Sequence, residues 1–289
     1  PSGIRHILYT WRLLKHARGA DLVIAFDPIT TGLPAAIVKQ ATGVATIARI
    51  GGDFLWERYV QRTGNLVTLP DFYADRRQWG GKERFLFKLI SFVLSSIDVA
   101  FSSAWQKDIW QRAYSLTSAR THVIENAIQE RLTSETGGQK NFLHYGRDLV
   151  LKNAPMLRQA FERVRKSHPE ISLEEGAVPQ AELLERIRKG YAVVLPSVSD
   201  VTPNYILDSI RCGKPFLLTK HSGYADRYRD FGVIVDPMIE DSIAEGLERL
   251  LDKTAYERMR TAIASYTEVR TYEDVAREFL ATRDGSLSR

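Results

Sequence analysis

Short apolar runs alternate along this chain with longer stretches whose apolar residues recur at helical spacing. The runs are continuous and rich in β-branched residues, as expected for strands buried on both faces of a parallel sheet. We predict strands at Asp21–Phe26, Val44–Ile50, Val99–Ser102, His122–Ile124, Phe142–Tyr145, Ile171–Leu173, Ala192–Pro196, Pro215–Thr219 and Val233–Asp236. Helices are predicted between them, for example at Ala154–Lys166, Ala181–Lys189 and Asp241–Leu251. This alternation predicts an α/β fold with doubly wound parallel sheets.

One polar segment, residues 133–139, interrupts the alternation. It contains glycines and shows no hydrophobic period, which is typical of a linker. We therefore predict a first domain at 1–130, a linker at 131–140 and a second domain at 141–270, followed by a C-terminal segment at 271–289.

The composition is that of a globular protein, because 44% of the 289 residues are hydrophobic and 26% are charged. It excludes a disordered or fibrous chain. The single cysteine, Cys212, excludes a disulfide framework and is typical of a reducing compartment, so we expect a cytoplasmic protein. The six histidines are dispersed, and we predict no metal site.

Positive charge gathers in the first half of the chain. Residues 1–140 hold 18 Lys and Arg and 12 Asp and Glu, a surplus of +6, whereas residues 141–289 hold 22 and 23. Such a surplus indicates a phosphate-rich partner, an anionic membrane, or simply a solvated basic face. Nucleic acid is not favoured, because the charges are scattered and no nucleic-acid-binding motif is present.

Two predicted helices, Ile4–Ala17 and Phe85–Ile97, combine apolar stripes with basic residues. Helices of this kind lie on anionic membranes, where they would suit a lipid-linked substrate. The same pattern also fits ordinary domain helices whose outer faces are basic.

A first motif with chemistry follows the apolar run 142–145, where Gly146 and Arg147 come at once and Lys152 comes five residues later. Glycine allows a sharp turn or a close approach of the backbone to a ligand. Arginine and lysine at the carboxyl end of a strand are suited to binding two phosphates. A cluster of surface charges is the alternative interpretation.

A second motif follows the strand predicted at Ala192–Pro196. Asp200 lies in the loop, Pro203 stands where a helix would begin, and Asp208 lies inside that helix. The positive end of such a helix attracts phosphate. A helix-capping Asp200 and an exposed Asp208 are the structural alternatives.

In this order and spacing, these motifs resemble the group 1, family 4-like, retaining glycosyltransferases of the GT-B fold, which have two Rossmann-like domains. The motifs that carry the resemblance are Gly146-Arg147 with Lys152, Asp200 with Asp208, Cys212–Pro215, Gly232–Pro237 and Tyr272–Phe279. The last of these resembles the family's final helix, which returns to the N-terminal domain. The N-terminal domain, on the acceptor side, then lacks its opening strand and glycine-rich loop, and we expect it to be incomplete.

The resemblance implies a nucleotide-diphosphate sugar as donor substrate and no cofactor or metal. By analogy, Arg147 and Lys152 would bind the diphosphate and take part in catalysis together with Asp200, which would contact the transferred sugar. Asp208 would hold the ribose. The donor-binding set implied in this way is Gly146, Arg147, Lys152, Asp200, Val201, Thr202, Pro203, Asn204 and Asp208.

Of the departures from the family pattern, two concern candidate site residues. Both acids are aspartate where the family has glutamate, so the contacts with the sugar must shift. In the first domain, Asp53 occupies the position where many members carry His-Asp. Asp53 and Asp27, each of which follows a predicted strand, are therefore candidates on the acceptor side, although turn aspartates explain them equally well.

Together these observations predict a cytoplasmic glycosyltransferase that moves a sugar to a glycan or glycolipid acceptor with retention. Peripheral contact with the inner face of a membrane is left open, because ordinary domain helices explain the basic helices as well. A sugar-nucleotide epimerase on the same fold and a non-catalytic sugar-nucleotide-binding protein remain as alternatives. The epimerase would use carboxylates and histidine for proton transfer.

Overall fold

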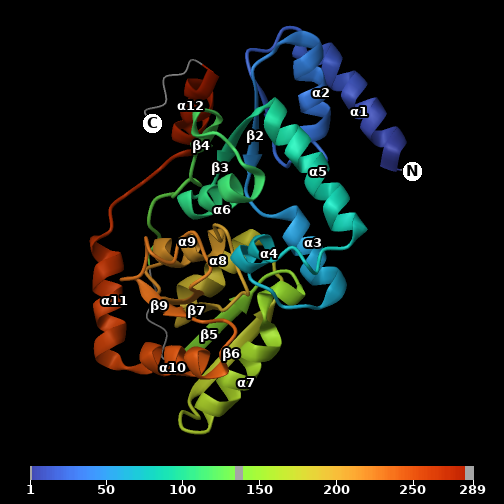
Figure 1. Cartoon of the computed structure of the whole chain (residues 1–289). Coiled ribbons are helices and arrows are strands. Elements are labelled where there is room, and N and C mark those ends of the chain that lie inside the picture. Colours follow the sequence, from blue (N-terminus) through green and yellow to red (C-terminus); the bar gives the residue numbers. More distant parts are fainter. Residues whose placement is uncertain (1, 134–138, 284–289) are drawn as a thin grey trace. The chain divides into compact units, whose positions relative to one another are not determined.

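The computed structural model describes residues 2–133 and 139–283, and these divide into two compact units (Figure 1). The first unit comprises Pro1–Trp56, Phe72–Asn126 and Tyr272–Arg289, and the second comprises Glu57–Asp71 and Ala127–Thr271. Residues 134–138 of the predicted linker lie outside the described residues. The grouping of Glu57–Asp71 with the second unit is a feature that the sequence did not predict.

The first unit contains a parallel sheet in which each strand pairs with the next one in the chain. The strands are β1 (Val23–Ala25), β2 (Thr46–Ile50), β3 (Asp98–Phe101) and β4 (Thr121–Val123), in the order β1-β2-β3-β4. All four agree with predicted strands.

The helices in the first part of the chain are α1 (Ser2–Ala17), α2 (Gly32–Thr42), α3 (Phe54–Thr63), α4 (Leu69–Ala74), α5 (Gly81–Ser96) and α6 (Ala104–Tyr114). Helix α12 (Tyr272–Arg283) also belongs to the first unit. Its Phe279 is 4% exposed and packs against Ile47 of β2, Ala100 of β3 and Ile124. This apolar contact holds α12 on the first sheet.

The sheet of the second unit is parallel and reverses its order once. Its strands are β5 (Lys140–Tyr145), β6 (Ile171–Gly176), β7 (Ala192–Leu195), β8 (Phe216–Thr219) and β9 (Gly232–Val235), in the order β6-β5-β7-β8-β9. Strand β6 continues three residues beyond its predicted end at Leu173, through Glu174 and Glu175. Because β6 lies at the edge of the sheet, polar residues are tolerated there.

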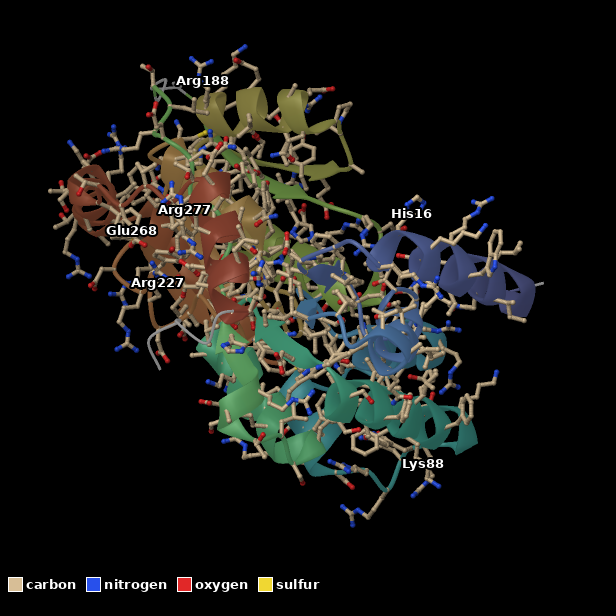
Figure 2. The ribbon with its side chains drawn as sticks, turned by 90° about the horizontal axis from the view of Figure 1, so that it is seen from above. His16, Lys88, Arg188, Arg227, Glu268 and Arg277 are labelled. Atoms are coloured by element: carbon tan, nitrogen blue, oxygen red, sulfur yellow. The ribbon has the colours of Figure 1, made fainter. Side chains whose placement is uncertain are left out.

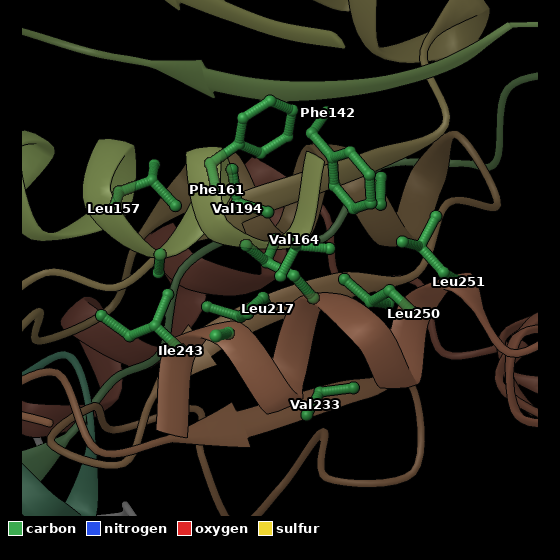
Figure 3. Packing of buried hydrophobic residues seen from close by; sticks show 14 of the residues in the cluster. Phe142, Leu157, Phe161, Val164, Val194, Leu217, Val233, Ile243, Leu250 and Leu251 are labelled. Carbon is green, nitrogen blue, oxygen red and sulfur yellow. The ribbon is translucent and has the colours of Figure 1, made fainter. Parts of the chain in front are cut away.

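Helices cover both faces of this second sheet. They are α7 (Ala154–Arg165), α8 (Gln180–Lys189), α9 (Asn204–Arg211), α10 (Glu240–Leu251) and α11 (Lys253–Ser265). Figure 3 shows the core on one face, where Phe142 of β5 packs with Phe161 of α7, Leu217 of β8 and Leu250 of α10. Successive strand residues point to opposite faces, so Leu143 and Tyr145 belong to the core beneath α8 and α9.

Each predicted strand is present, and the predicted α/β class is confirmed. Several helices were not predicted, among them α4, which has only six residues and therefore too little length for a hydrophobic period. Across the described residues, the longest and most apolar helices still fall short of what is needed to cross a membrane.

Candidate functional site

The strand order of the second sheet reverses between β5 and β7, and this reversal marks the place where a ligand-binding crevice is expected. From β5 the chain passes to β6 on one side and then to β7 on the other, so β5 and β7 are neighbours. In an open parallel sheet, the loops that follow two such strands diverge, and ligands bind at their carboxyl ends. These loops are residues 146–153 and 196–203, and they contain most of both predicted motifs.

The loop after β5 is fixed by Asn153. Its backbone adopts φ 60 between a short turn at Val150–Lys152 and the start of α7, a conformation that asparagine tolerates better than most residues. Its buried side chain donates hydrogen bonds to the carbonyl oxygens of Pro196, at 3.2 Å, and Pro237, at 2.8 Å. Asn153 thereby joins the segments that follow β5, β7 and β9. No role was predicted for Asn153, although its place directly before a helix is a turn signal.

Lys152 and Asp200 form an ion pair across the two loops. Lys152 Nζ lies 2.6 Å from Asp200 Oδ2, and the side chains are 21% and 16% exposed. The structure thus brings together two residues that the sequence placed in separate motifs, and it pairs them, which was not predicted. A bound anion would compete with the Asp200 carboxylate for the Lys152 ammonium.

Arg147 stands beside this pair and is exposed. Its guanidinium has no hydrogen bond or ion pair with any residue that the structure describes. A free guanidinium presents up to five N–H donors in a planar fork, which suits phosphate oxygens. Arg147 therefore remains available to an anion when Lys152 is held by Asp200.

Gly146 is not required by the fold. Its φ lies outside the left-handed region, so a sharp turn does not explain the glycine. A Cβ added there would meet no atom closer than Lys152 Cε, at 4.0 Å. The second predicted reason, close approach of a ligand to the backbone, is consistent with this open space.

A cavity of about 470 Å³ lies against both loops. Its lining includes Gly146, Arg147, Lys152, Asp200, Asn204 and Asp208. The volume is within the range of small-molecule sites. Sequence reasoning therefore found much of the lining of one continuous cavity.

Asp208 lies on α9 and is 7% exposed. Its Oδ2 accepts a hydrogen bond of 2.8 Å from Gln180 Nε2, and its Oδ1 lies 3.1 Å from Arg211 Nη1. Gln180 also lines the cavity and was missed. Gln180 is the first residue of the helix that follows β6, so it lies at the carboxyl edge of the sheet. This position after a strand is the signal by which it could have been predicted.

The loop after β7 is braced by backbone hydrogen bonds. Asp200 N donates to His221 O at 3.0 Å, and Gly223 N donates to Val201 O at 2.9 Å. Val201 and Thr202 are buried and do not belong to the cavity lining, whereas Pro203 and Asn204 do. Pro203 and Asn204 bring the positive end of α9 to the cavity.

The two candidates on the acceptor side have structural roles in the first unit. Asp53 is completely buried and accepts hydrogen bonds from Trp110 Nε1 at 2.9 Å and Tyr73 Oη at 2.8 Å. Burial, followed by the charge of Asp53, raises the pKa of Tyr73 well above its usual value, so the phenol stays protonated. The Asp27 carboxylate accepts hydrogen bonds from Ile29 N and Thr31 N in the turn before α2. These hydrogen bonds fit the interpretation of both residues as structural aspartates. Neither residue lines the cavity of the second unit.

Solved structures with this fold are numerous. The E. coli trehalose-6-phosphate structure bound with UDP-2-fluoro glucose superposes with a TM-score of 0.72 at 13% identity, over 100% of this chain and 78% of that one. Anabaena HepE in complex with UDP-glucose gives 0.70 at 12% identity, over 95% and 81%. Sucrose-phosphate synthase from Thermosynechococcus elongatus gives 0.68 at 13% identity, over 93% and 74%.

These likenesses establish the fold, and the chain has the GT-B architecture of two Rossmann-like α/β units that its motifs predicted. No protein-family model matches the sequence, and a search of curated proteins finds no match.

The free guanidinium leads to a first prediction. Replacing Arg147 with alanine should weaken the binding of inorganic pyrophosphate about tenfold or more, because a hydrogen bond to a charged group contributes about 1.5–3 kcal/mol. Isothermal titration calorimetry measures the affinity. Arg165→Ala, which removes an exposed arginine of α7 that pairs with Glu162, is the control. Equal affinities of the two variants would remove Arg147 from the site.

Proposed function

We propose that this protein is a glycosyltransferase whose donor is a nucleoside-diphosphate sugar bound by the second unit. The observation that carries the proposal is the placement of Arg147 and Lys152 in one cavity at the strand-order reversal. Solved structures of the same fold in complex with UDP or with UDP-glucose support this choice of donor.

In this proposal the donor's diphosphate lies against Arg147 and displaces Asp200 from Lys152. The ribose lies toward Asp208, whose carboxylate is oriented by Gln180 and Arg211 and accepts hydroxyl hydrogen bonds. The positive end of α9, at Asn204, adds a favourable field for the phosphates.

Sugar transfer breaks the bond between the anomeric carbon and the phosphate oxygen and forms a bond from that carbon to an acceptor hydroxyl oxygen. The hydroxyl proton passes to the departing diphosphate, on which negative charge develops as the bond breaks. Arg147 and Lys152 stabilise that charge where it forms, which lowers the barrier without a separate acid. The proposal assigns this role to the two side chains rather than to a metal ion or cofactor. Retention of the anomeric configuration and a hexose as the transferred group rest on the family resemblance.

Asp200 has two functions in this scheme. It holds Lys152 in place before the donor arrives, and once displaced its carboxylate accepts hydrogen bonds from hydroxyls of the transferred sugar. The shorter aspartate, relative to the family's glutamate, fits the direct contact of 2.6 Å with Lys152.

Asp200→Asn tests catalysis separately from binding. The variant should lower UDP release from UDP-glucose about a hundredfold, because preorganised electrostatic groups typically contribute that much. UDP affinity should stay at the wild-type level or rise, since Lys152 is then free of its partner. Asp226→Asn, which changes a fully exposed aspartate of the same unit, is the control. Full turnover by Asp200→Asn would favour a binding protein or a different catalytic group.

We further propose that the acceptor is lipid-linked and that the first unit contacts an anionic membrane. Helix α2 packs against both α1 and α5, and these three helices hold seven Lys and Arg against one acidic residue, Glu83, which is buried (Figure 1). Figure 2 labels His16 on α1 and Lys88 on α5, both of them exposed. Such a surface complements anionic headgroups.

Apolar side chains are exposed between these charges. Ile7 is 70%, Trp11 is 54% and Phe85 is 66% exposed, and an apolar hollow of about 340 Å³ lies between α1 and α2. Phe85 and Phe92 are seven residues apart and therefore share a face of α5. Of the apolar stripe predicted on α1, the Ile4 side chain lies outside the described residues. Exposed aromatic residues beside basic ones are typical of helices that lie in a membrane interface.

The membrane contact can be measured by sedimentation with vesicles. The wild-type protein should bind vesicles containing phosphatidylglycerol and should bind phosphatidylcholine vesicles weakly, with salt reducing the difference. The double variant Trp11→Glu, Phe85→Glu should bind the anionic vesicles at least tenfold more weakly. Tyr272→Glu, which changes an aromatic residue of α12 that is 68% exposed, serves as the control. Equal binding of wild type and double variant would contradict the contact.

A further inference from the structure

A second cavity lies at the same edge of the second sheet, mainly on the opposite face of β5. Its volume is about 330 Å³, and its lining includes His144, Arg147, Lys152, Arg158 and Glu175. His144 follows Phe142 by two residues and therefore points to the side of the sheet that α7 covers. The two cavities share Tyr145, Gly146, Arg147 and Lys152. They therefore meet at the proposed phosphate-binding groups.

His144 presents a hydrogen-bond acceptor to this cavity. The side chain is 7% exposed, and its Nδ1 lies 2.8 Å from the carbonyl oxygen of Val194. A carbonyl oxygen only accepts, so Nδ1 carries the proton. Burial lowers the pKa of the imidazole and keeps it neutral, which leaves a lone pair on Nε2. That nitrogen has no hydrogen-bond partner among the residues that the structure describes.

Glu175 presents a second acceptor. Its Oε2 accepts a hydrogen bond of 2.7 Å from Arg158 Nε, whereas its Oε1 is buried and has no hydrogen-bond partner in the described chain. Buried polar atoms without a partner are uncommon, and a ligand is one way to satisfy them. The exposed carboxylate of Asp148 lines the same cavity and adds further acceptor capacity.

The positive groups of this cavity lie at its junction with the first. Arg147 is unpaired in the described structure, while Lys152 and Arg158 are each held by a carboxylate. Helix α7 begins at Ala154, which lines the cavity, and Asn153 uses its side-chain amide on Pro196 and Pro237 instead of capping the helix. A ligand here therefore needs hydroxyl donors at one end and a negative group at the other.

We propose that this second cavity binds a sugar ring that carries a phosphate. The phosphate lies between Arg147 and the start of α7, and the ring hydroxyls donate to Nε2 of His144 and to the carboxylate of Glu175. Such a ligand has two sources, namely the sugar of the donor itself, in which case the inference rests on the proposed function, or a separate sugar phosphate.

Calorimetry on the whole chain separates these sources. The probes are UDP, UDP-glucose and glucose 6-phosphate. The test variants are His144→Asn, whose amide still donates to Val194 O, and Glu175→Gln. His168→Asn, which changes a partly exposed histidine after α7, is the matched control.

If the cavity holds the donor sugar, both test variants should bind UDP-glucose at least tenfold more weakly while UDP affinity is unchanged. If it holds a separate molecule, glucose 6-phosphate should bind the wild-type protein, and the test variants alone should lose that binding. Wild-type affinities of both folded test variants for every probe would overturn the inference. So would a wild-type protein that does not bind glucose 6-phosphate and binds UDP-glucose no better than UDP.

A wild-type protein that fails to bind UDP and UDP-glucose but binds glucose 6-phosphate through His144 would contradict the proposed function alone. Should the variants fail to fold, imidazole nitrogen NMR of the wild-type protein gives the answer. The Nε2 resonance of His144 must shift when a sugar-containing probe binds and must not shift with pyrophosphate, and a resonance that does not respond to any sugar overturns the inference.

Discussion

The single reversal of strand order between β5 and β7 is the constraint on which the candidate site depends. It places two loops from distant parts of the sequence at one edge of the sheet and forces them apart. Asn153 then fixes that geometry, because one buried amide joins the segments that follow β5, β7 and β9. A backbone hydrogen bond of 2.9 Å from Val198 N to Leu151 O is a second link between the loops that carry Asp200 and Lys152.

The electrostatics of the site follow from that geometry. One cation, Lys152, is already compensated by Asp200, and the other, Arg147, is free within the described chain. A site of this kind is stable when empty because the less exposed charge is paired. It still attracts an anion, because the exposed charge is not. In the proposed function, binding exchanges Asp200 for a ligand oxygen at Lys152, which frees a carboxylate close to the ligand.

The strands and several residues of the candidate site could be predicted from the sequence, for physical reasons. Strands buried on both faces are continuous apolar runs, and such runs are easy to recognise, as β7 and β8 illustrate. The motif residues Arg147, Lys152 and Asp200 were recognisable because glycine, proline and charge mark the carboxyl ends of strands. The resemblance to a known fold joined them into one site.

Other features depend on tertiary contacts that local sequence does not encode. Lys152 pairs with Asp200 and Gln180 orients Asp208, and in each pair the residues are far apart in the chain. The burial of Glu175 Oε1 without a partner likewise depends on how the chain packs around it. Asp53 shows the reverse case. It follows a strand, as a site residue would, but Trp110 and Tyr73 bury it in a structural hydrogen-bond network. A position directly after a strand therefore does not by itself distinguish a site residue from a structural one.

A crystal structure of the protein with UDP tests the central claim most directly. The account predicts phosphate oxygens at hydrogen-bond distance, about 2.7–3.2 Å, from both Arg147 and Lys152. It also predicts that Asp200 has moved away from Lys152 and that the ribose lies toward Asp208. UDP bound elsewhere, or bound while the Lys152–Asp200 pair stays intact and Arg147 stays free, would contradict it.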